Sequence, residues 1–246
     1  KRSILFLILM TALLTGLGIT MLASTSYFTE EGKGEEYVTL WKQAVWVGIS
    51  VAACLTMALI DFNRWYKWRW WVLGITCAGL LACYEWYLAK FFGWKPLLAI
   101  RAGGAARWIG LPGISVQPSE FAKVALVMVL AGWFATYQDM ERTLKHGLLL
   151  PGAILGGVVL LIGGEVDLGN ACVAAAVGGG IMFVAGTRFS YLAVIIGSGI
   201  TALLAGVHFA PNRMDRVMAI FDLEKFKDGI GLQQWVSWLA FGSGGL

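Results

Sequence analysis

The chain has 246 residues, of which 58% are hydrophobic and only 14% are charged, and its formal net charge is +4 at pH 7. A mean hydropathy of +0.71 together with so few charges excludes an ordinary soluble domain and predicts a polytopic membrane protein. Nearly uncharged stretches long enough for a membrane helix predict seven spans, at residues 4–21, 44–60, 70–88, 121–137, 147–164, 168–187 and 189–209.

The loops between these spans carry charge asymmetrically. Basic residues precede the first span and follow spans two, four and six, at Lys1, Arg2, Arg64, Lys67, Arg69, Arg142, Lys145 and Arg188. Because Lys and Arg concentrate in cytoplasmic loops, the pattern predicts a cytoplasmic N-terminus. The outer loop at residues 89–117 is an exception, since it is basic and has no acid. It indicates either an anionic ligand at the outer face or a long loop that escapes the charge rule.

The fourth span begins with an acid and a base. Residues 117–123 read Gln-Pro-Ser-Glu-Phe-Ala-Lys, so Pro118 suits the first helical turn and Glu120 complements the positive end of the helix dipole. Glu120 and Lys123 are three residues apart and share a helix face. A charge at the centre of a membrane helix costs about 2.5–3.5 kcal/mol and usually faces a polar interior. Two interpretations stay open: the pair lines a polar cavity, or Glu120 caps the helix while Lys123 reaches the interface.

Four short motifs follow one another along the chain. They are Arg107-Trp108-Ile109, the 117–123 segment, Asp167-Leu168-Gly169-Asn170-Ala171, and the final Phe241-Gly242-Ser243-Gly244-Gly245-Leu246. In this order they resemble the SEDS family, the RodA/FtsW/SpoVE group of bacterial cell-wall proteins. The last two resemble that family's P-D-L-G-T and I-G-S-G-G-L segments, although Glu165 and Val166 stand where Gln-Pro is usual. Arg-Trp-Ile and Gly-Thr-Arg, at 186–188, favour the division type over the elongation type.

The resemblance implies an all-α, polytopic transmembrane bundle of about ten helices. Residues 1–246 would then be one SEDS-type membrane domain that looks truncated within the large outer loop after span seven. The implied enzyme is a peptidoglycan glycosyltransferase that polymerises lipid II at the outer face of the bacterial cytoplasmic membrane. Its implied partners are lipid II, the growing glycan strand and a class B penicillin-binding protein transpeptidase, with no nucleic acid. Two alternatives stay open, a lipid II transporter and a non-catalytic scaffold for a transpeptidase.

The expected chemistry needs a base and cations. A base must deprotonate the acceptor 4-hydroxyl as it attacks the anomeric carbon, and cations must stabilise the departing undecaprenyl pyrophosphate. In the family, the proposed catalytic Asp lies in the loop after span seven, in a pattern like N-P-x-x-D-P-x-G-x-G-Y-Q that is rearranged here. Asp228, which precedes a Gly-x-Gly sequence, is the favoured base, and Asp222 and Glu224 are its alternatives. A solvated loop charge is the other interpretation.

The resemblance also implies residues that bind substrate. Arg107 would bind pyrophosphate as a fork-shaped donor and Trp108 would pack against sugar or prenyl chain, unless both are interfacial anchors. Asp167 belongs either to this site or to a plain helix N-cap. The complete set of predicted binding residues is Arg107, Trp108, Glu120, Lys123, Asp167, Arg213 and Arg216. No cofactor is certain, a divalent cation is left open, and the four cysteines lack the spacing of a metal site.

Overall fold

The computed structural model describes residues 2–30, 38–102, 105–111, 114–208, 218–219, 222–229 and 231–244. The chain divides into two compact units, Lys1–Trp65 and Tyr66–Leu246. The single membrane domain expected from the sequence stays a prediction. The first unit contains helices α1 (Arg2–Glu30) and α2 (Val38–Leu59), which pack against each other. Their large apolar side chains are mostly exposed, as expected of helices that face lipid.

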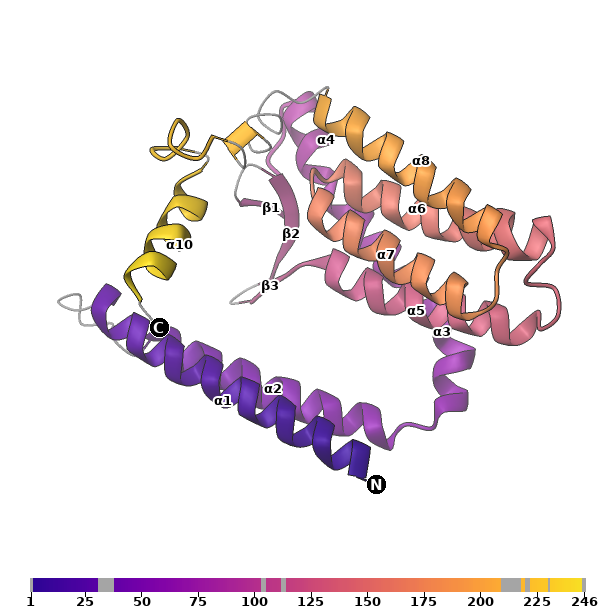
Figure 1. Ribbon diagram of the computed structural model, residues 1–246, viewed down its shortest axis with the longest axis horizontal. Coiled ribbons are helices and arrows are strands. Elements are labelled where there is room, and N and C mark those ends of the chain that lie inside the picture. Colours follow the sequence, from indigo (N-terminus) through magenta and orange to yellow (C-terminus); the bar gives the residue numbers. More distant parts are fainter. Residues whose placement is uncertain are drawn as a thin grey trace. The chain divides into compact units, whose positions relative to one another are not determined.

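The second unit is mainly helical (Figure 1). Helix α3 (Phe62–Cys83) begins just before its boundary and is followed by the short α4 (Glu85–Phe92). Further helices in the described residues are α5 (Pro118–Thr136), α6 (Leu150–Gly164), which follows a π-helical turn at Leu144–Leu149, α7 (Leu168–Val184), α8 (Phe189–His208) and α10 (Leu232–Ser243). Helix α7 packs against α5, α6 and α8, and α5 also packs against α6.

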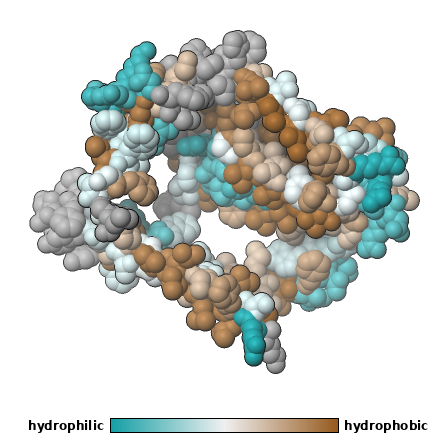
Figure 2. All heavy atoms as spheres, viewed as in Figure 1, coloured by the Kyte–Doolittle hydropathy of each residue, from teal (hydrophilic) through white to brown (hydrophobic). Residues whose placement is uncertain are grey.

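All seven spans predicted from the sequence contain helix in the structure. Six apolar helical segments in the described part of the chain are long enough to cross a membrane, and α7 is a shorter apolar helix. Figure 2 shows apolar residues along the bodies of the helices and hydrophilic residues towards their ends. The prediction of a polytopic helical membrane protein is therefore confirmed.

A small antiparallel sheet precedes α5 and was not predicted. Strands β1 (Ala99–Ala102), β2 (Ala105–Leu111) and β3 (Ile114–Val116) pair in the order β1-β2-β3. Ile100 lies opposite Trp108, and Ile109 lies opposite Val116. Strand β2 packs beside α5, and β3 ends one residue before Gln117, the N-cap of α5. The sheet therefore holds Arg107, on β2, near the beginning of α5.

The buried core joins α3, α5, α6, α7 and α8. Its members include Leu80, Leu126, Leu130, Leu155, Val158, Ile162, Ala174, Met182 and Leu192. Lipid tails are as apolar as leucine, so close packing, more than escape from water, must hold such helices together. Gly178 on α7 illustrates this packing, because a Cβ atom there would collide with the side chain of Leu155 on α6.

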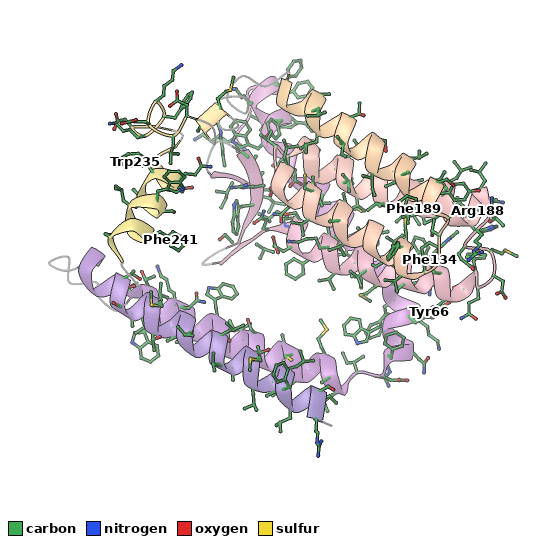
Figure 3. All side chains as sticks on the ribbon, viewed as in Figure 1. Tyr66, Phe134, Arg188, Phe189, Trp235 and Phe241 are labelled. Carbon is green, nitrogen blue, oxygen red and sulfur yellow. The ribbon has the colours of Figure 1, made fainter. Side chains whose placement is uncertain are left out.

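Helices α3 and α5 are also joined by polar contacts near the beginning of α3. Tyr66 Oη lies 2.6 Å from Thr136 Oγ1, and the guanidinium carbon of Arg69 lies 3.9 Å from the centre of the Tyr66 ring. Figure 3 labels Tyr66 on α3 and Phe134 near the end of α5. A Cβ atom at Gly132 would meet Arg69, so glycine makes room for this contact. These contacts fix α3 against the end of α5 that lies farthest from Gln117.

Candidate functional site

Asp167 is the centre of a polar cluster that joins β2, α5 and α7. Its side chain is only 6% exposed, and its carboxylate lies 3.7 Å from Arg107 Nη1. Gln117 Nε2 donates to Asp167 Oδ2 at 2.8 Å, and Asn170 Nδ2 donates to the same oxygen at 3.0 Å. A carboxylate so far removed from solvent needs such partners, because an unpaired buried charge is costly. The contacts bring the Arg-Trp-Ile, Gln-Pro-Ser-Glu and Asp-Leu-Gly-Asn motifs together.

Asn170 extends the cluster to the acid and base of α5. Its Oδ1 accepts a hydrogen bond of 3.0 Å from Lys123 Nζ, and its Nδ2 also lies 3.4 Å from Ser119 Oγ. Lys123 forms an ion pair of 2.8 Å with Glu120, with the Lys123 side chain 20% exposed and that of Glu120 54% exposed. The connected residues are Arg107, Gln117, Glu120, Lys123, Asp167 and Asn170, and we call them the α5–α7 polar cluster.

The N-cap interpretation of Asp167 is confirmed, and its place in a substrate-binding site stays a prediction. It is the N-cap of α7, since its Oδ1 accepts from the Asn170 backbone N–H at 3.3 Å, and it also pairs with Arg107 and Gln117. Val166, the preceding residue, has a φ of 68°. A β-branched residue is rare in this left-handed region, and such strain persists only where the surrounding structure enforces it.

Glu165, between α6 and α7, is a buried acid next to the cluster. Its side chain is completely buried, and neither carboxylate oxygen has a hydrogen-bond partner among the described residues. Burial, and then the negative charge of Asp167, raise the pKa of Glu165 to about 8. Cys83 lies beside this carboxyl group and favours its charged form, but no hydrogen bond of good geometry joins the two. Glu165 is therefore mainly protonated at neutral pH.

Replacing Glu165 with Gln should raise the stability of the protein at alkaline pH. A raised pKa means that the folded state holds a proton that the unfolded state releases, so stability is complete below about pH 4.5 and falls as pH rises towards 8. The amide cannot ionise and should remove a loss of a few kcal/mol near pH 8. Thermal unfolding in detergent from pH 5 to 9 measures this. Parallel pH profiles for the parent and Glu165→Gln would show that Glu165 does not titrate in this range.

The predicted loop acids lie in a turn before α10. Asp222, Glu224 and Asp228 are all exposed, and Asp222 Oδ1 accepts from the backbone N–H of Lys225 at 3.3 Å. Among the described residues, the hydrogen bonds of this turn and of α10 all stay within residues 218–244. The structure thus does not link these acids to the α5–α7 polar cluster. Arg213 and Arg216 lie outside the described residues.

Other sequence predictions have mixed outcomes. Trp108 is half-buried on β2, next to Arg107, and takes part in the sheet. Pro118 occupies the first turn of α5 with Glu120, as predicted. An open surface groove of about 520 Å³ lies between α3 and α6 and is lined by apolar residues, Leu73, Cys77, Ala153, Ile154, Gly157, Val158, Leu160 and Leu161. Neither Glu120 nor Lys123 lines it, and the polar cavity expected at this pair stays a prediction.

The sequence interpretation missed two members of the cluster as site residues, Gln117 and Asn170. A usable signal was present, because Asn170 follows Asp167 by three residues and so lies on the same face at the beginning of α7. In the described part of the chain, no three His, Cys, Asp or Glu residues lie together in a way that would hold a metal ion. The chemistry available here is that of two cations, two carboxylates and two amides.

Comparisons with known proteins identify the family. Residues 4–246 match the model of the FtsW, RodA and SpoVE family, described as cell cycle protein. The chain therefore belongs to this family. It is 32% identical over 245 residues to a probable peptidoglycan glycosyltransferase FtsW of Trichlorobacter lovleyi. The aligned residues cover 98% of this chain and 61% of that protein. A protein of the same name from Thiomicrospira cyclica is 30% identical, with 98% of this chain and 59% of that protein covered.

Solved structures share the fold. A chain of a peptidoglycan synthase complex, described for its structural coordination of polymerization and crosslinking, matches with a TM-score of 0.56 at 21% identity, over 85% of this chain and 58% of that one. The rod shape determining protein RodA of Thermus thermophilus matches with a TM-score of 0.54 at 20% identity, over 77% of this chain and 58% of RodA. The chain thus spans about three fifths of the length of these relatives.

Proposed function

We propose that the protein is a peptidoglycan glycosyltransferase that polymerises lipid II into glycan strands. The observation that carries the proposal is the α5–α7 polar cluster, which holds the cations Arg107 and Lys123 at one end of an apolar bundle. Relatives named probable peptidoglycan glycosyltransferase FtsW support the reaction class. A lipid-linked pyrophosphate suits this arrangement, because its prenyl chain can stay in the bilayer while its phosphates meet the cations.

The direction in which the helices run supports a position of the cluster at the outer face of the membrane. Helices α5 and α7 begin at the cluster, and α6 ends at Gly164, next to the cluster. The α5–α6 and α7–α8 connections lie together at the opposite end of the bundle (Figure 1). Those connections carry Arg142, Lys145 and Arg188, and basic loops are typical of the cytoplasmic side. We therefore infer a protein of the bacterial cytoplasmic membrane with its N-terminus in the cytoplasm and the cluster facing outwards.

In this proposal the residues of the cluster have separate roles. Arg107 binds a phosphate of the lipid-linked donor or strand, with Trp108 beside it against sugar or prenyl chain. Lys123 supplies the second positive charge, and Glu120 and Asp167 hold the two cations in place. The base that accepts the proton of the acceptor 4-hydroxyl is a loop acid, Asp228 in our assignment. A class B penicillin-binding protein transpeptidase would crosslink the strands that this chemistry produces.

The direct test is polymerisation by the complete gene product. Purified protein in detergent should convert lipid II into glycan strands that lysozyme digests, in the absence of any other glycosyltransferase. In sealed liposomes, a transporter would instead move lipid II between leaflets without lengthening it. A protein that does neither, but binds a class B transpeptidase, would be a scaffold. Polymer formation supports the proposal, and either of the other two outcomes overturns it.

Arg107→Lys should weaken binding of lipid II about tenfold. A guanidinium donates two parallel hydrogen bonds to a phosphate, whereas an ammonium acts as a point charge, and Arg107 Nε is buried with no partner among the described residues. Binding to nanodisc-embedded protein at several salt concentrations measures the change. Arg101→Lys, which changes an exposed residue of β1 in the same sheet, is the matched control and should bind like the parent. Equal affinity of Arg107→Lys and the parent at every salt concentration would contradict the prediction.

A further inference from the structure

Asn170 connects Lys123 to Asp167 within the α5–α7 polar cluster, and the proposed function gives it no role. Its amide oxygen accepts from Lys123 Nζ at 3.0 Å, while its amide nitrogen donates to Asp167 Oδ2 at 3.0 Å. Its backbone N–H also donates to Asp167 Oδ1 at 3.3 Å. One side chain therefore contacts both the ammonium of α5 and the carboxylate that pairs with Arg107.

The neutrality of the Asn170 side chain determines how it can connect its two charged partners. An amide is neutral and offers a donor and an acceptor at once, so it can join a carboxylate to an ammonium without changing the charge of either. An acid in its place would add a second negative charge beside Asp167 and pair with Lys123 directly. An apolar residue would leave the Lys123 ammonium with Glu120 as its one partner among the described residues, and the Glu120 side chain is 54% exposed. A long lysine side chain held by one exposed partner retains much of its rotamer freedom.

We propose that Asn170 is a positioning residue that holds the Lys123 ammonium on the same side of the cluster as Arg107, so that the two cations bind one diphosphate together. This proposal rests on the proposed function, because it names the diphosphate of the lipid substrate as the shared ligand. Asp167 anchors the arrangement at both ends, through Arg107 at 3.7 Å and through Asn170. Two fixed cations favour a diphosphate over a monophosphate, because the second phosphate gains a charge-assisted contact only if the second cation is in place.

Binding of prenyl phosphates tests the proposal without requiring polymerisation. Farnesyl diphosphate and farnesyl monophosphate are titrated into the complete gene product in nanodiscs. The parent should prefer the diphosphate, and Asn170→Ala should lose about three- to tenfold in affinity for the diphosphate with little change for the monophosphate. Asn170→Asp should lose more, because the new carboxylate neutralises Lys123. Equal losses for both ligands would overturn the proposal, since a general disturbance of the site would produce them.

A matched control and a double variant separate positioning from folding. Gln117→Ala also removes a partner of Asp167 but does not touch Lys123, so it should keep the preference for the diphosphate. In Lys123→Gln the ammonium is absent, and adding Asn170→Ala should then change diphosphate affinity by less than twofold. Additive losses in the double variant would show that Asn170 acts on something other than Lys123.

The kinetic consequence is distinct from that of the general base. In a polymerisation assay, Asn170→Ala should raise KM for lipid II with a smaller effect on kcat, because it loosens a substrate contact. A loss in kcat alone would contradict the inference. If the parent protein fails to polymerise lipid II, the proposed function fails, while the prenyl diphosphate titrations still decide the role of Asn170.

Discussion

Asp228→Asn should reduce polymerisation of lipid II about 10²–10⁴-fold, the usual contribution of a general base. The amide keeps the size of the side chain but cannot accept the proton of the acceptor hydroxyl. Lipid II binding should stay close to that of the parent, because Asp228 is exposed and lies outside the contacts of the α5–α7 polar cluster. The measurement is the rate of glycan formation by the complete gene product, with lipid II affinity determined separately.

Asp222→Asn and Glu224→Gln are the matched controls for this assignment. Both residues are exposed acids of the same turn, and both should retain polymerisation at close to the parental rate. If Asp228→Asn polymerises normally while one control is inactive, the catalytic position has been assigned to the wrong acid of this loop. If all three variants remain fully active, none of these acids is the base, and the reaction proposed for the protein must be abandoned or assigned to other residues.

The helical architecture was predictable because membrane helices have a clear sequence pattern. Backbone polar groups in lipid must be satisfied within the segment, so each span needs a long apolar stretch, and these stretches are visible by composition alone. The beginning of α5 was equally clear, since Pro118 and Glu120 are favourable in a first turn. In contrast, β1 and β3 have only four and three residues. Strands this short show no clear alternation of apolar and polar residues, and they depend on pairing with β2.

The polar cluster was only partly predictable for a different reason. Arg107, Glu120, Lys123 and Asp167 stand out as charges in an apolar chain, so the sequence identifies them as candidates. Their connection depends on Asn170, which contacts Lys123 across 47 positions of sequence. A neutral amide carries no comparable signal, and the register between α5 and α7 follows from the packing of both helices. Tertiary contacts of this kind become visible only when the helices are placed together.

Asp167→Ala should cost about 2–4 kcal/mol of stability, the largest loss that we expect from a single change in the cluster. Alanine removes the N-cap of α7, which contributes about 1 kcal/mol, and leaves Gln117 and Asn170 without their carboxylate partner. Removing one partner of a buried ion pair costs about 3–5 kcal/mol, but Arg107 is 34% exposed, so its share is smaller. Thermal unfolding in detergent, with urea titration at fixed temperature, measures the loss.

Asp61→Ala provides the matched control for Asp167→Ala, because it separates the cap from the network. Asp61 immediately precedes α3, and its carboxylate accepts from the backbone N–H of Asn63 at 3.4 Å, but it is exposed. Its replacement should therefore cost no more than about 1 kcal/mol, the contribution of an N-cap alone. Asp167→Asn keeps an acceptor for the cap and removes only the charge, so its cost should fall between those of the two alanine variants. Equal losses for Asp167→Ala and Asp61→Ala would mean that Arg107, Gln117 and Asn170 gain nothing from Asp167, and the cluster would then not be a connected site.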